Sequence, residues 1–159
     1  MGLSDRINQF DPENEIDRIE KFIAHKKSEI GFKKGIIGLS GGIDSSLTTV
    51  LAKRALSNRQ IEVVFLPEAT TPDVDRNDVE SLARKFELNV KTIELDGLVS
   101  GFEEKIGELP ELAEANLKAR IRMVVLYALA NRSGGLVLGT GNLSEWLLGY
   151  FTKYGDGAA

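Results

Sequence analysis

The chain has 159 residues, a length that suits one domain with a substantial hydrophobic core. Apolar residues make up 42% and charged residues 28%, and the net charge of −4 gives no sign of a surface for nucleic acid or anionic membranes. The sequence contains no cysteine, which excludes disulfides, thiolate metal sites and a cysteine nucleophile within it. No apolar run is long enough to span a bilayer. We therefore expect a cytoplasmic domain that binds neither nucleic acid nor membrane.

Helical and strand-like patterns alternate along the chain. A helix is expected from the Asp11-Pro12 entry up to Gly31, because aspartate favours the cap and proline the first turn. The later helices are expected at residues 44–57, 75–87, 96–107 and 115–132, and the strands at 35–39, 61–66, 89–95 and 136–138. Strands separated by helices predict parallel βαβ units. The expected fold is therefore α/β, a doubly wound parallel sheet flanked by helices, in a single domain over residues 1–159.

Ligands of such sheets bind beyond the carboxyl ends of the strands. Three polar stretches are expected there, residues 40–46, 67–73 and 139–145. They are the candidate binding segments.

The first of these stretches has the features of an anion-binding loop. Residues 35–56 read GIIGLSGGIDSSLTTVLAKRAL, a short strand, a Ser-Gly-Gly turn and a helix. Amides at a helix start favour anions, and glycines let a ligand approach the backbone. Asp44 lies in this cradle, and a bridging Mg²⁺ would explain a carboxylate beside phosphate. The alternative is that Asp44 only caps the helix.

Two other motif matches are weaker. Gly38-Leu39-Ser40-Gly41-Gly42 fits the G-x-S-x-G elbow of α/β-hydrolases, but the single histidine, His25, precedes the serine and a hydrolase needs it afterwards. Gly139-Thr140-Gly141 partly fits G-x-G-x-x-G, but position 144 is serine. Neither a serine hydrolase nor a nicotinamide-dependent dehydrogenase is favoured.

The helix at 115–132 is apolar from Ile121 to Ala130 except for Arg122. A helix with this pattern is expected to be covered on most faces. It could lie between the sheet and another helix, or between the sheet and a second subunit, and we favour the homodimer. Trp146 is expected in the core.

Several blocks resemble one family. SGGIDS at 40–45 is similar to the pyrophosphate-binding loop SGGxDS of the ATP pyrophosphatase group. Within that group, the stretch LVLGTGNLSEWLLGYFTKYGDG at 136–157 resembles the signature of ammonia-dependent NAD synthetase. NLKAR at 116–120 and LPEATTP at 66–72 resemble two further blocks of that family. The resemblance implies an adenine nucleotide alpha-hydrolase-like fold.

It also implies a reaction and a set of site residues. The nicotinate carboxylate of deamido-NAD attacks the α-phosphate of ATP, and ammonia then displaces AMP to give NAD. The resemblance assigns Mg²⁺ to Asp44 and Glu145, deamido-NAD to Arg120 and Lys153, and the adenine to the backbone near residues 65–67. It assigns ATP to Gly38, Leu39, Ser40, Gly41, Gly42, Ile43, Asp44, Ser45 and Thr140.

Family members continue after GDG with a further segment, whereas this sequence reads GDGAA and stops. The resemblance therefore covers the front portion of the family's enzyme. A nucleotide-binding module without turnover and another adenylating ligase of the same loop group are the alternatives. Because the sequence has no cysteine for a glutamine amidase, ammonia is the expected nitrogen source.

Overall fold

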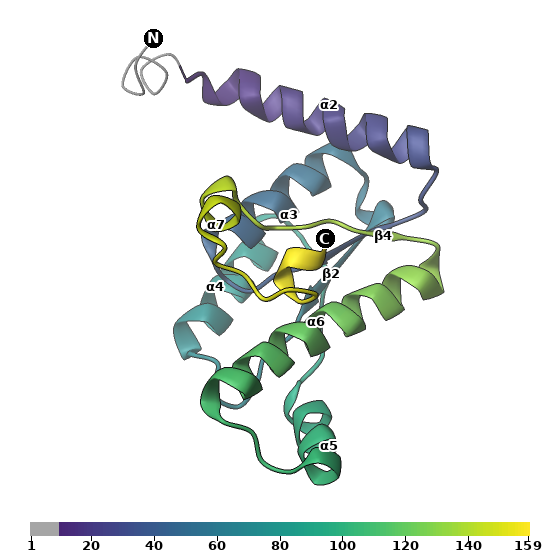
Figure 1. The fold of residues 1–159 in the computed structure, drawn as a ribbon. Coiled ribbons are helices and arrows are strands. Elements are labelled where there is room, and N and C mark those ends of the chain that lie inside the picture. The colour runs from purple at the N-terminus through teal and green to yellow at the C-terminus, as the bar shows by residue number, and fades with distance from the viewer. Residues whose placement is uncertain (1–9) are drawn as a thin grey trace.

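The computed structural model describes residues 10–159, which form helices around one central sheet (Figure 1). The part of the domain prediction that covers residues 1–9 lies outside the described residues. The α-helices are α2 (Pro12–Ile30), α3 (Ile43–Ala55), α4 (Asp73–Lys85), α5 (Asp96–Ile106), α6 (Glu111–Ser133) and α7 (Leu143–Leu148). The strands are β1 (Gly35–Gly38), β2 (Ile61–Phe65), β3 (Val90–Thr92) and β4 (Leu136–Val137), and two 3₁₀ turns lie at Asn58–Gln60 and Asp156–Ala158.

The sheet is parallel throughout, in the order β3-β2-β1-β4. Strand β1 lies between β2, with Ile37 opposite Val63, and β4, with Ile36 opposite Val137. The chain thus leaves β1 toward one side of the sheet and later returns to its other side. This reversal of direction places a crevice at the carboxyl end of β1.

Alternate residues of the strands face two separate hydrophobic clusters, as a doubly wound sheet requires. Ile36 and Val64 pack against the cluster that includes residues of α5 and α6. Ile37 and Val63 pack on the opposite face, in the cluster that includes residues of α3 and α4. All four of these strand side chains are buried. The predicted fold class is confirmed.

Most predicted elements are present with shifted ends. Asp11 caps α2 by accepting hydrogen bonds from the amides of Glu13 and Asn14, at 3.1 and 3.3 Å. Helix α6 begins at Glu111, four residues before the predicted start, because Pro110 takes the cap position ahead of a polar first turn. The strand predicted at 89–95 is only Val90–Thr92.

One expectation about the C-terminal segment was wrong. Trp146 lies on α7, a helix that the sequence pattern did not predict; its side chain is 53% exposed, with its ring 4.8 Å from the ring of Phe151. Helix α6 leaves Val124 and Tyr127 67% and 40% exposed within this chain, and its expected cover by a second subunit stays a prediction. One side packs on the sheet and its first part lies near α5 (Figure 1).

Among residues 10–159, no helix is long and apolar enough to cross a membrane.

The loop after β1 has little room for a side chain. Gly41 has φ +93°, and a Cβ there would lie 2.8 Å from the carbonyl oxygen of Asp75 on α4. Gly101, in the middle of α5, has no atom within 4 Å of such a Cβ. The same substitution should therefore have opposite effects at these two positions.

We predict that Gly41→Ala lowers the free energy of unfolding by at least about 1 kcal/mol, from left-handed strain plus the clash with α4. Gly101→Ala should raise it by about 0.5–1 kcal/mol, because alanine loses less backbone entropy in a helix. Urea unfolding of the two variants checks both signs. Equal stability of Gly41→Ala and wild type would contradict the described loop conformation.

Candidate functional site

The Ser-Gly-Gly loop between β1 and α3 is held by its own hydroxyl groups. The Ser45 hydroxyl donates to the Gly42 carbonyl at 3.0 Å and accepts from the Ser40 amide at 3.1 Å. The two serine hydroxyls lie 3.0 Å apart. Ser45 is buried, so it shapes the loop from inside, while Ser40 is exposed at its surface.

Helix α3 begins behind this loop without a side-chain cap. Its cap position is Gly42, whereas Asp11 caps α2 and Asn142 caps α7. The alternative in which Asp44 caps the helix is therefore wrong. An uncapped first turn of a 13-residue helix presents amide groups and the positive end of the helix dipole to an anion.

The carboxylate of Asp44 faces the segment after β4. Its Oδ2 accepts a hydrogen bond from the side-chain amide of Asn142 at 3.2 Å, across 98 residues of sequence. The backbone amide of Asn142 donates to Oε2 of Glu145 at 2.9 Å. The two predicted metal ligands thus contact the same residue, although they belong to different strand–helix units.

This pair of carboxylates fits a magnesium ion that is shared with a phosphate chain. Mg²⁺ is usually held by one or two carboxylates together with substrate phosphates and water. Within residues 10–159, no group of three or more His, Cys, Asp or Glu side chains could form an all-protein cage. Asp44, in the first turn of α3, and Glu145 offer the hard oxygen ligands that Mg²⁺ takes in proteins, and Asn142 contacts both side chains.

A cavity of about 480 Å³ opens at the carboxyl ends of the three neighbouring strands β2, β1 and β4. Ser40 and Ser45 line it from the β1 loop, Thr71 from the loop after β2, and Thr140 from the segment after β4. The three stretches that the sequence singled out therefore meet at one place.

Arg120 and Lys153 also lie together. The Nε of Arg120 donates to the backbone carbonyl of Lys153 at 3.2 Å, and both side chains are exposed. Neither residue lines the cavity of the Ser-Gly-Gly loop. Arg120 thus contacts the backbone of Lys153 away from the residues that line this cavity.

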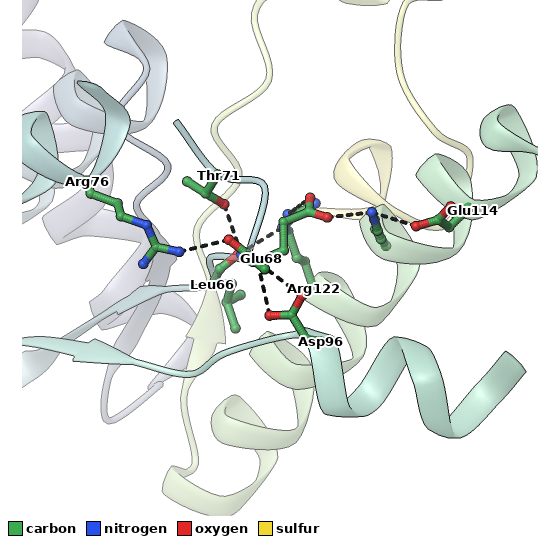
Figure 2. A network of polar contacts seen from close by, with 9 residues as sticks. Leu66, Glu68, Thr71, Arg76, Asp96, Glu114 and Arg122 are labelled. Carbon is green, nitrogen blue, oxygen red and sulfur yellow. Dashed lines mark hydrogen bonds and ion pairs between the residues drawn. The ribbon is translucent and has the colours of Figure 1, made fainter. Parts of the chain in front are cut away.

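One cluster at the cavity was missed by sequence reasoning. Glu68, in the loop after β2, pairs with Lys118 and Arg122 of α6, the latter at 3.1 Å (Figure 2). Lys118 also pairs with Glu114 at 2.7 Å. The i, i+4 spacing of Glu114, Lys118 and Arg122 on α6 indicated a row of charges on one face of the helix. Nothing in the sequence identified Glu68 as the partner of the two cations.

These contacts shift two pKa values. Burial acts to raise the pKa of Glu68, but hydrogen bonds from Lys118 and Arg122, together with their charges, prevail and lower it. The hydrogen bonds to Glu114 and Glu68 raise the pKa of Lys118. Both residues are therefore held in their charged forms.

An open parallel sheet, an uncapped helix behind a glycine loop and a cavity at the strand ends define a nucleotide-binding α/β domain. Comparison with known proteins identifies the particular family. The NAD synthase family model matches residues 15–159, and the chain belongs to this family.

Curated relatives include the NH(3)-dependent NAD(+) synthetases of Thermoplasma volcanium and Methanosarcina mazei. The first is 43% identical over 92% of this chain and 60% of its own length, and the second 44% identical over 92% and 59%. The chain thus spans about 60% of the length of the curated relatives it matches.

Solved structures of NAD synthetases and of an NMN synthetase are also similar to this chain. The NH3-dependent NAD synthetase of Campylobacter jejuni superposes with a TM-score of 0.87 and 33% identity, over 92% of this chain and 64% of that one. The NMN synthetase of Francisella tularensis superposes with a TM-score of 0.88 and 30% identity, over 95% and 63%.

The lowered pKa of Glu68 predicts a pH dependence of stability. In the unfolded chain this carboxyl regains its ordinary pKa, so the unfolded state binds more protons and stability decreases as the pH falls. The contribution is complete above about pH 5 and is lost as the pH falls through the ordinary glutamate value of about 4.3 toward the folded value. We expect the free energy of unfolding to fall less steeply below about pH 5 in Glu68→Gln than in wild type. If urea unfolding gave the same pH dependence of the free energy of unfolding for both proteins, the lowered pKa of Glu68 would be contradicted.

Proposed function

We propose that this chain forms the ATP-binding portion of an ammonia-dependent NAD synthetase. The observation that carries the proposal is the meeting of the Ser-Gly-Gly loop, the loop after β2 and the segment after β4 at one cavity. The uncapped start of α3 follows that loop, and Asn142 contacts both Asp44 and Glu145. The curated relatives named above add the chemical class. ATP and deamido-NAD are the proposed nucleotide substrates, and ammonia is the nitrogen source. We also propose a cytoplasmic location, as expected from the sequence.

In this proposal, residues 38–45 and Thr140 bind ATP with its phosphates at the start of α3. Ser45 acts by shaping the loop, since its hydroxyl already has partners within it. Asp44 and Glu145 would hold Mg²⁺, which would neutralise phosphate charge when bound. The exposed first turn of α3 supplies amide donors to the same phosphates.

The protein's task is then to orient two nucleotides. The carboxylate of deamido-NAD attacks the α-phosphorus of ATP, and pyrophosphate leaves with the electron pair of the broken P–O bond. Ammonia next attacks the acyl carbon of the adenylate, AMP leaves, and the nitrogen loses a proton to give the amide of NAD. Holding the reactants together and stabilising phosphate charge account for most of the required catalysis.

Arg120 and Lys153 are proposed to bind deamido-NAD, because both offer positive charge and Arg120 contacts the backbone of Lys153. We also propose a homodimer through α6. Val124 and Tyr127 present an apolar surface on that helix which this chain leaves exposed.

The direct test is turnover. We predict that the chain joined to the remaining segment of its Thermoplasma volcanium relative forms NAD, AMP and pyrophosphate in equal amounts from deamido-NAD, ATP and ammonia. The chain alone should bind ATP weakly and form little NAD, because water reaches the adenylate. Equal rates would mean that residues 1–159 are a complete enzyme. Amidation of nicotinate mononucleotide instead of deamido-NAD would favour the activity named for the Francisella structure.

A second prediction concerns the metal. Asp44→Asn keeps the size of the side chain but removes its charge, so it should weaken Mg²⁺-dependent ATP binding by roughly 10- to 100-fold. Asp78→Asn, an exposed position further along α4 that does not line the cavity, is the matched control and should have no effect. Calorimetry across a Mg²⁺ series measures both. An unchanged Mg²⁺ dependence in Asp44→Asn would remove Asp44 from the metal site.

A third prediction separates the two nucleotides. Arg120→Ala should weaken deamido-NAD binding by about 1.5–3 kcal/mol, the cost of a charge-assisted contact, and leave ATP binding nearly intact. Arg132→Ala, at the far end of the same helix, should change neither. Calorimetric titration with each nucleotide is the measurement. An equal loss of both ligands in Arg120→Ala would contradict the assignment.

A further inference from the structure

Glu68 is a half-buried carboxylate between two parts of the molecule. It follows β2 in the chain, and its side chain is 16% exposed. One oxygen pairs with Arg122 at 3.1 Å and the other with Lys118 (Figure 2). Both cations lie on α6, so Glu68 fastens the loop after β2 to that helix.

The backbone of the same loop is fixed from several directions. The Glu68 amide donates to the Thr71 hydroxyl at 2.9 Å, and the Glu68 carbonyl accepts from Arg76 at 2.8 Å. The amide of Ala69 donates to both carboxylate oxygens of Asp96, each at 3.0 Å. Residues 67–71 therefore form a loop with a defined shape rather than a loose connection.

Arg122 links this loop to the end of β2. Its Nε donates to the carbonyl of Leu66 at 3.2 Å while its Nη2 holds Glu68. Leu66, Glu68 and Arg122 all line the cavity that the Ser-Gly-Gly loop opens into. The charged cluster is thus part of the cavity wall.

Stability alone is a poor explanation for this cluster. Removing charged groups from water is costly, and a well-packed apolar substitute for such a pair is often as stable or more so. The side chains of Glu68 and Lys118 are both mostly buried, at 16% and 20% exposure. A function that needs a fixed geometry at the cavity explains them better.

We infer that Glu68 is a positioning residue for the nucleoside end of ATP. It acts through Arg122, whose contacts hold the backbone at Leu66 and the following loop in the shape that receives the base and ribose. The inference rests on the proposed function, in which the phosphates occupy the α3 end of the same cavity. The base and ribose of ATP then lie against the wall formed by residues 65–71.

The test uses two probes that occupy different ends of the cavity. Adenosine reports on the nucleoside end, and inorganic pyrophosphate with Mg²⁺ reports on the cradle at α3. In Glu68→Gln, the affinity for adenosine and for ATP should fall about tenfold, the order of one lost charge-assisted contact, while pyrophosphate binding stays unchanged. A purely structural role would lower both affinities together or neither.

Glu62→Gln is the matched control. Glu62 lies on β2, the strand that Glu68 follows, is 18% exposed, and faces two cations, Lys34 at 3.9 Å and Arg132 at 3.8 Å. It is at the opposite end of the strand and does not line the cavity. This substitution should leave adenosine affinity unchanged, and thermal unfolding of both variants shows that each is folded at the temperature of the titration.

A double variant tests the route through Arg122. If Glu68 acts through Arg122, adenosine affinity in Glu68→Gln/Arg122→Gln should equal that of the single variant that binds adenosine less tightly. It should not fall by the product of the two single-variant factors. If the two substitutions instead lowered adenosine affinity by independent factors that multiply, Glu68 would not act through Arg122. Unchanged adenosine affinity in folded Glu68→Gln, beside a wild type that binds adenosine, would overturn the positioning role alone. A wild type that binds neither ATP nor adenosine would contradict the proposed function, and the inference with it.

Discussion

The site depends on the pairing of β1 with β2 on one side and with β4 on the other. Parallel pairing aligns the carboxyl ends of these strands, so the chain segments that leave them must meet at one edge. Residues far apart in sequence, such as Asp44 and Asn142, are thereby brought within hydrogen-bond distance. The cavity and the cradle are direct consequences of this strand order.

The electrostatics of the site follow from the same arrangement. The start of α3 offers amide donors and a positive dipole end, and Asn142 contacts the carboxylates of both Asp44, in that first turn, and Glu145 of α7. On its own, a carboxylate pair would repel phosphate, whereas a shared divalent cation makes the two compatible. The other wall of the cavity carries Glu68 and Arg122, which pair with each other, and Lys118, outside the lining, pairs with Glu68 and Glu114. The cavity therefore combines an anion-binding end with a wall whose charges are already paired.

The helix α6 connects the two nucleotide positions of the proposed enzyme. Lys118 and Arg122 hold Glu68, which lines the cavity, and Arg120 between them contacts the backbone of Lys153. A helix places residues two positions apart on different faces, which explains why neighbouring cations serve different segments. The exposed Val124 and Tyr127 further along the helix are the surface on which we base the proposed dimer.

The sequence predicted the fold well, because strand and helix periods are local and the turn residues mark their ends. The cap at Asp11 and the loop at residues 40–45 were also readable, since each depends on a few adjacent residues. The cluster around Glu68 was not, because its partners lie 50 and 54 residues away and only the tertiary fold selects them. Trp146 was misplaced for a related reason: an apolar side chain on a short helix gave no sign of which face the chain would cover.

The most direct test of the account is to map nucleotide binding on the isolated chain by amide chemical shifts. Titration with Mg²⁺-ATP should perturb the amides of residues 38–45, 65–71 and 139–142 most strongly. Those of β3 and of the α2 surface should change little. Perturbation centred on α2 and the far side of α3, or none at the Ser-Gly-Gly loop under saturating nucleotide, would contradict the assignment of this cavity to ATP.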